Sequence, residues 1–117
     1  MTIATTEELI DHSVVEELRE AMGPEAFADI AATYSDQVGL IVQRFVRAAA
    51  ASDRCQMALA AHELVGLAGT MGAPRLAALG RLAMARGRNE PEADCSALAS
   101  EMDAAATATL DAFQRYV

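Results

Sequence analysis

The chain has 117 residues and a formal net charge of -8, from 17 acidic residues against nine basic ones, all of them arginine. This acidic balance disfavours nucleic acid as a partner, because phosphate binding needs a basic surface. The length suits one domain with one hydrophobic core. Alanine occurs 27 times and only five residues are aromatic, so we expect an all-α protein.

The N-terminal part of the chain predicts a polar segment followed by a short helix. Residues 1–12 are polar and threonine-rich, and we expect a flexible segment there, so that one helical domain covers 13–117. Ser13 and Glu16 have the spacing of a capping box, in which each side chain bonds the other's backbone N–H group. A short helix to about Met22 should follow.

Two longer amphipathic helices are expected next. Pro24 suits the first position of a helix, and apolar residues recur at three- and four-residue spacings from there to the alanines at 48–51. Asp53 is a suitable N-cap for a third helix, which we expect to end within residues 69–72, where two glycines occur.

The last two helices complete the predicted architecture. Pro74 restarts the chain in a fourth helix with Gly87 as its stop, and residues 89–91 offer the start of a final helix that no glycine or proline interrupts. Four substantial amphipathic helices with short connections predict an antiparallel up-and-down four-helix bundle with a short additional N-terminal helix.

One histidine, His62, stands in unusual surroundings on the third predicted helix. Helical periodicity turns it away from the apolar stripe that contains Leu64 and Met71. Its outward neighbours at helical spacings are all small or apolar, namely Ala58, Leu59, Val65, Gly66 and Gly69. Because each helical glycine costs about 1 kcal/mol relative to alanine, we expect another backbone or partner to approach closely there.

The segment after this histidine is locally basic. No acidic residue occurs between Glu63 and Glu90, whereas four arginines do, at positions 75, 81, 86 and 88. Two interpretations stay open at this point: a solvated helix face, or a docking surface for an acidic partner.

Metal and nucleotide sites are disfavoured by the pattern around His62. His62-Glu63 begins like the zinc motif HExxH, but Gly66 stands where the second histidine would be. Gly66, Gly69 and Gly72 follow no predicted strand, so they do not form a phosphate-binding loop for ATP. A neutral imidazole can still attack an activated phosphoryl group, which would have to arrive on another protein.

Residues 61–83 resemble the signature of histidine phosphotransfer (Hpt) domains, and the whole chain is similar to them in size and helix order. The matching residues are Ala61, His62, Leu64, Gly66, Ala68, Gly69, Gly72, Leu76 and Leu79. The resemblance implies a phosphocarrier and no enzyme: His62 accepts a phosphoryl group at Nε2 from a receiver-domain aspartate and passes it to another receiver in a multistep two-component phosphorelay.

The resemblance also implies the partner and the contact surface. The partners would be response-regulator receiver domains, including one carried by a hybrid histidine kinase, and the receiver would supply the magnesium, because this chain has no cofactor of its own. Gly66 and Gly69 would let the receiver approach, while Ala58, Leu59 and Val65 would form an apolar ring around the histidine.

Two positions depart from the pattern of the family. A lysine usually stands three residues after the histidine, where this chain has Val65, and a polar side chain is common near Met84 on the following helix. We hypothesise that Arg81 or Arg88 supplies the missing charge, since a guanidinium suits phosphate. The alternative is that both arginines merely face water.

Three functions are therefore weighed. The first is the phosphorelay shuttle, and the second is a non-phosphorylated Hpt-like docking regulator of a receiver or kinase, which Val65 and the lack of lysine favour. A metal or cofactor bundle is disfavoured, because one outward histidine supplies no ligand set. We expect a cytoplasmic monomer with reduced cysteines and no membrane partner, since neither a secretory signal nor a membrane-spanning run is evident.

Overall fold

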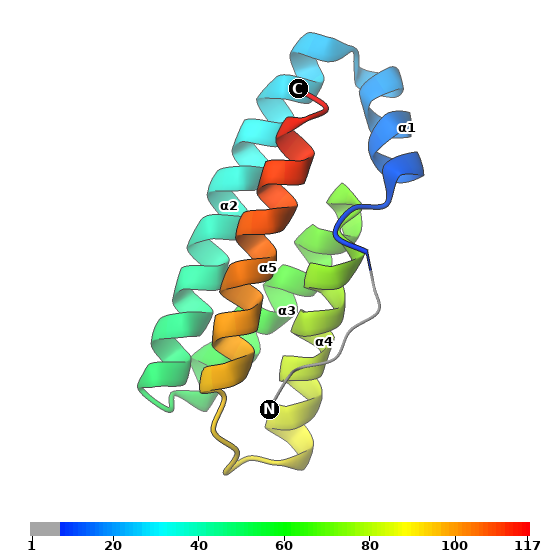
Figure 1. The fold of residues 1–117 in the computed structure, drawn as a ribbon. Helices are drawn as coiled ribbons and strands as arrows, with labels where there is room; N and C mark the ends of the chain where they lie inside the picture. Colours follow the sequence, from blue (N-terminus) through cyan, green and yellow to red (C-terminus); the bar gives the residue numbers. More distant parts are fainter. Residues whose placement is uncertain (1–7) are drawn as a thin grey trace.

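The computed structural model describes residues 8–117, and within that range it consists of helices and their connections, without strands (Figure 1). The helices are α1 (His12–Met22), α2 (Pro24–Ala50), α3 (Arg54–Met71), α4 (Pro74–Asn89) and α5 (Ser96–Gln114). The predicted all-α class is confirmed. The first seven residues of the predicted N-terminal segment lie outside the described residues.

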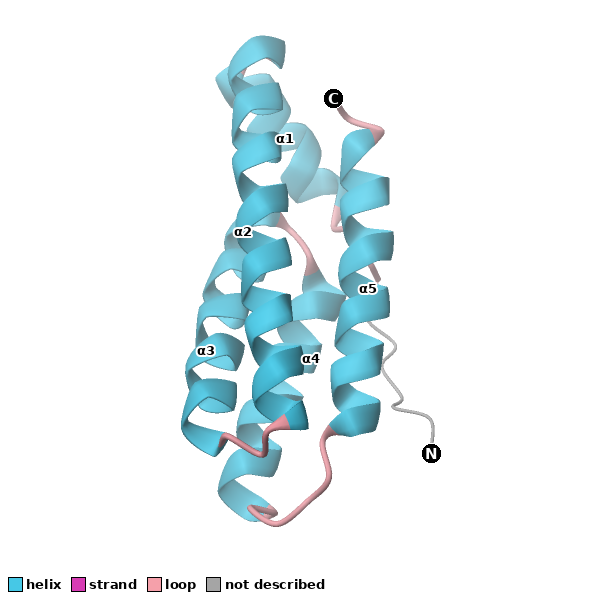
Figure 2. Cartoon of the chain, turned by 90° about the vertical axis from the view of Figure 1, so that its left-hand side faces the viewer, coloured by secondary structure: helices cyan, strands magenta, loops and turns pink. Residues whose placement is uncertain are grey.

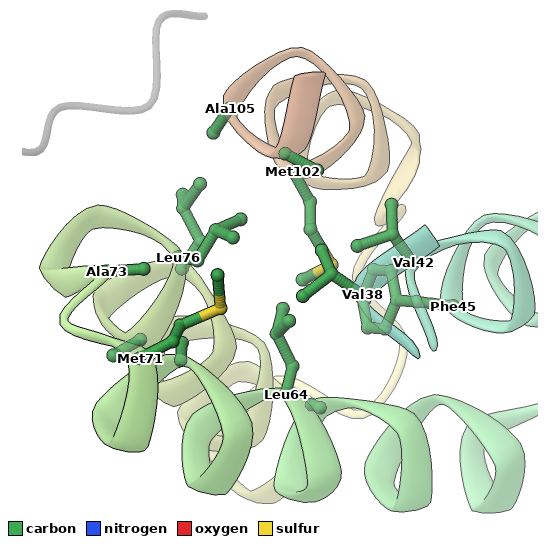
Figure 3. Packing of buried hydrophobic residues seen from close by; sticks show 14 of the residues in the cluster. Val38, Val42, Phe45, Leu64, Met71, Ala73, Leu76, Met102 and Ala105 are labelled. Atoms are coloured by element: carbon green, nitrogen blue, oxygen red, sulfur yellow. The ribbon is translucent and has the colours of Figure 1, made fainter. Parts of the chain in front are cut away.

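The core lies between the four longer helices. α2 contacts α3 and α5, and α4 contacts the same two helices. Figure 3 shows Phe45, Leu64, Leu76 and Met102, one from each of these helices, directed into a common interior, and all four are fully buried. α1 packs against α2, beside the end at which α2 begins (Figures 1 and 2). Burial of these apolar side chains is the main force that holds the helices together.

The predicted breaks between the first helices are confirmed. Pro24 is the first residue of α2, a position whose N–H group would have no acceptor within the helix, so its absence in proline costs nothing. The carboxylate of Asp53 accepts a hydrogen bond from the N–H of Gln56 at 3.1 Å and caps α3. Gly72, with φ of 72°, ends α3 in the left-handed conformation that glycine adopts without strain.

The capping box predicted at the start of α1 is wrong. Asp11 is the N-cap, and its carboxylate accepts hydrogen bonds from the backbone N–H groups of Ser13 and Val14. An ionised carboxylate is a stronger acceptor than a hydroxyl, and this one satisfies two of the free N–H groups at the start of the helix. The Ser13 hydroxyl, which also donates to Asp11, and the Val14 N–H lower the pKa of Asp11 from its ordinary value.

The residues just before α1, which the sequence placed in a flexible segment, make defined contacts. Ile10 is buried. The Asp11 N–H donates to the carbonyl of Gly72 at 2.9 Å, and the Arg75 N–H donates to the carbonyl of Glu8 at 3.0 Å. The chain therefore packs onto the connection between α3 and α4 from Glu8 onward, because a buried isoleucine and two backbone hydrogen bonds hold it there.

The predicted boundaries between α4 and α5 are also wrong. Gly87 does not stop α4: it is not among the positive-φ glycines, and the Glu90 N–H still donates to a carbonyl one turn back. The predicted restart at 89–91 does not occur: Asn89 is the last residue of α4, and residues 90–95 connect it to α5. α5 begins at Ser96, whose N–H and hydroxyl both donate to the carboxylate of Asp94. This local turn at Asp94 directly precedes the helix, whose N-cap residue, Cys95, makes no side-chain capping bond of its own.

One buried hydroxyl yields a test of the core. Thr109 on α5 is fully buried, and its Oγ1 has no hydrogen-bond partner within residues 8–117. Because an unsatisfied buried polar group costs about 1–3 kcal/mol, we expect Thr109→Val to raise the free energy of unfolding by about 1 kcal/mol in urea denaturation. Thr107→Val, at an exposed threonine of the same helix, is the control. A less stable Thr109→Val variant would mean that the hydroxyl has a partner.

Candidate functional site

The outward orientation predicted for His62 is confirmed. The residue lies in the middle of α3 and is exposed, and its imidazole makes no hydrogen bond or ion pair within residues 8–117. Its neighbours Ala61 and Leu64 are fully buried. The helix is therefore anchored on one side while it presents the imidazole to solvent on the other, so that both ring nitrogens are available to a partner.

The two glycines that follow His62 leave open space on the surface. A Cβ added at Gly66 or Gly69 would have no atom of another element within 4 Å, and both residues are exposed. Neither glycine is needed for helix packing inside this chain. Ala58 and Leu59, predicted to contact a partner, are exposed as well, and the Leu59 side chain is 51% accessible.

Val65, which we predicted to face outward and contact a partner, lies close to α4. It is half-buried, and its Cγ2 would be 2.8 Å from a Cβ placed on Gly80 of α4. The same Cβ would be 3.2 Å from the carbonyl oxygen of Ala61. Gly80 thus lets the two helix backbones approach closely beside His62, and sequence reasoning missed it. A glycine between the apolar residues Leu79 and Leu82 of a predicted helix was the available signal.

The acidic neighbour of His62 is engaged elsewhere. Glu63 Oε2 lies 2.5 Å from Nη2 of Arg44 on α2, and both side chains are almost half exposed. An ion pair of this exposure adds at most about 1 kcal/mol of stability. Its consequence for the site is that the carboxylate next to His62 is turned toward α2 and its charge is balanced there.

The two candidate arginines occupy different places along α4. Arg81 and Arg88 are both exposed and have no ion-pair partner within the described chain. Seven residues separate them, which is about two turns or roughly 10 Å along one helix face. Because the adjacent Gly80 lies against Ala61 and Val65, Arg81 stands at the level of His62 along the pair of helices.

A small cavity lies between α3 and α4, beyond the level of His62. It has a volume of about 220 Å³ and is lined by Arg54, Met57, Ala58, Ala83, Met84, Gly87, Arg88 and Cys95. Ala58 precedes His62 by one helical turn, so the cavity opens beside the face that carries the histidine. The sequence did not predict it, because three separate segments of the chain form its wall.

Other kinds of site find little support in the part of the chain that the structure describes. No group of three or more histidine, cysteine, aspartate or glutamate side chains there could hold a metal ion. None of the helices described is long and apolar enough to cross a membrane. Cys55 and Cys95 form no disulfide.

No family model, no curated protein and no solved structure matches this chain. The function is therefore inferred from the geometry around His62 and from the charges beside it.

The contact at Gly80 can be tested by adding a methyl group. Gly80→Ala gains up to about 1 kcal/mol of helix propensity, but forcing a group into a packed contact costs about 1–3 kcal/mol. We expect overpacking against Ala61 and Val65 to dominate and the free energy of unfolding to fall by about 1 kcal/mol. Gly39→Ala on α2, where the added Cβ has open space, is the control and should not destabilise. A stabilised Gly80→Ala variant would contradict the close approach.

Proposed function

We propose that this protein is a histidine phosphotransfer carrier in which His62 accepts a phosphoryl group from the aspartate of one receiver domain and passes it to another. The observation that carries the proposal is the exposed, unpaired imidazole of His62 on a helix face that Gly66 and Gly69 leave open. The proposal includes the finer fold: α2 to α5 as an antiparallel up-and-down four-helix bundle, with α1 as the additional helix.

The chemistry needs little from this chain beyond a positioned nucleophile. Nε2 of His62 attacks the phosphorus of an aspartyl phosphate, so that an N–P bond forms while the P–O bond to the aspartate breaks and the carboxylate leaves. The entering and leaving atoms lie in line, and positioning and electrostatics supply the catalysis. The receiver contributes the magnesium and the acidic residues that hold it, and the reverse reaction loads the next receiver.

The remaining features of the proposal follow from this division of work. A carrier needs no cofactor of its own, and its contact with each receiver is transient, because it must release one to meet the next. We propose a cytoplasmic monomer whose partners are receiver domains, with neither nucleic acid nor membrane as a partner.

A docking regulator that carries no phosphate is the second candidate. The packing of Val65 against α4 favours it, since position 65 offers no positive charge to a phosphoryl group on His62. In that case the same face would bind a receiver or a kinase and change its activity by occupancy alone.

A phosphotransfer assay separates the two functions. Incubated with a phosphorylated receiver domain, the wild-type chain should gain an acid-labile phosphoryl group. This transfer should be faster than the hydrolysis by which the receiver alone loses its phosphoryl group. His62→Gln keeps the size and polarity of the side chain but removes the nucleophile, and it should gain none. His12→Gln, at the only other histidine, should behave as wild type. Transfer to His62→Gln, or no transfer to wild type from any receiver, would refute the carrier function.

The role of Arg81 can be measured on the phosphorylated protein. If its guanidinium stabilises the phosphoryl group, Arg81→Ala should shorten the lifetime of phosphorylated His62 several-fold in a label-loss assay. Arg115→Ala, at an exposed arginine that follows α5, is the control. Equal lifetimes for all three proteins would mean that Arg81 only faces water.

A further inference from the structure

Charge is divided unevenly between the two helices beside the cavity and the rest of the molecule. Residues 54–89, which include α3 and α4, hold five arginines and one acidic residue, whereas the rest of the chain holds four arginines and 16 acidic residues. The one acid, Glu63, is paired with Arg44. A strongly acidic protein therefore presents one basic pair of helices, and that pair carries His62.

The cavity between α3 and α4 combines an apolar lining with positive charge. Met57, Ala58 and Met84 belong to the lining, and Arg54 and Arg88 bring a guanidinium from each helix. Neither arginine has an ion-pair partner within residues 8–117. Figure 1 shows that α3 begins and α4 ends at the same end of the molecule, which explains how these two arginines come to line one cavity.

The size of the cavity favours a single side chain as its occupant. Its volume of about 220 Å³ lies below the roughly 300–1,000 Å³ of small-molecule sites. Buried apolar anchors of one partner that fill pockets on the other supply much of the affinity in protein interfaces. An anchor flanked by carboxylates would satisfy the apolar lining and the two guanidinium groups together.

We infer that this cavity is a docking socket for the receiver domain and takes one apolar side chain of the receiver. Arg54 and Arg88 pair with carboxylates of the receiver on either side of that side chain. The inference rests on the proposed function for the identity of the partner. The affinity for the receiver then comes from a site distinct from Nε2 of His62, the atom that reacts. Because His62 lies outside the cavity lining, filling the socket weakens docking and leaves the transfer step itself intact.

Gly87→Leu tests the socket without endangering the fold. Gly87 lines the cavity, a Cβ there meets no atom within 4 Å, and leucine is a better helix former than glycine. The matched control is Gly39→Leu, at a helical glycine with equally open space. Gly39 precedes Val46 by two turns, and Val46 lines a groove shared with α5, so the control position faces away from α4.

The measurement is the rate of phosphotransfer as a function of receiver concentration, with a receiver that loads the wild-type chain. Gly87→Leu should raise the half-saturating receiver concentration about tenfold or more, since one apolar anchor is excluded, while the maximal rate stays within about twofold. Gly39→Leu should match wild type in both. Thermal denaturation should show all three proteins folded.

Charge reversal tests the second half of the inference. Arg88→Glu should raise the half-saturating concentration, and the effect should shrink as salt is added, because rim charges act through screened attraction. Arg115→Glu carries the same change of net charge away from the socket and should have little effect.

The outcomes separate this inference from the proposed function. If wild type is loaded by a receiver and Gly87→Leu keeps its half-saturating concentration, the socket is refuted and the carrier function stands. If no receiver loads wild type, both are refuted. A change of oligomeric state in Gly87→Leu, measured by sedimentation, would assign the cavity to a second copy of this chain and overturn the inference as well.

Discussion

The close approach of α3 and α4 at Gly80 is the constraint on which the site depends. A side chain at this position would collide with Val65 and with the carbonyl oxygen of Ala61, the residue before His62. The absence of a side chain lets α4 lie directly beside the segment of α3 that carries the histidine. The positions of Arg81 and of the cavity wall relative to His62 follow from this one contact, since a rigid helix transmits it along its whole length.

Rigidity and accessibility are combined in the histidine helix. Ala61 and Leu64 are fully buried on either side of His62, whereas Gly66 and Gly69 leave the outer surface unoccupied. A nucleophile on such an element is held in place by the core and needs no ordering when a partner arrives. The proposed carrier therefore divides the work: this chain offers a positioned imidazole and a docking face, and the receiver brings the phosphoryl group and its metal ion.

The packing of the helices gives different roles to Val65 and to the arginines proposed to replace the usual lysine of the Hpt pattern. Val65 stands where a lysine is usual in the Hpt pattern, and in this chain it lies against Gly80 of α4. The arginines proposed as substitutes are not equivalent, because Arg81 lies at the level of His62 whereas Arg88 lines the cavity. Under the proposed function, the charge near the phosphoryl group and the charge used for docking therefore belong to different residues.

The sequence by itself determined the helical class, most helix boundaries, the exposure of His62 and the open face at Gly66 and Gly69. These depend on periodicity and capping, which act over one to four residues and can be derived from neighbouring letters. Its failure at Asp11 came from choosing between two possible local caps, and its failure before α5 came from placing the start of that helix at 89–91 instead of Ser96. Only the tertiary structure decided the role of Gly80, the pairing of Arg44 with Glu63, and the cavity. Each of these joins residues of different helices, and their meeting depends on how two helices rotate and slide against each other, which no local pattern specifies.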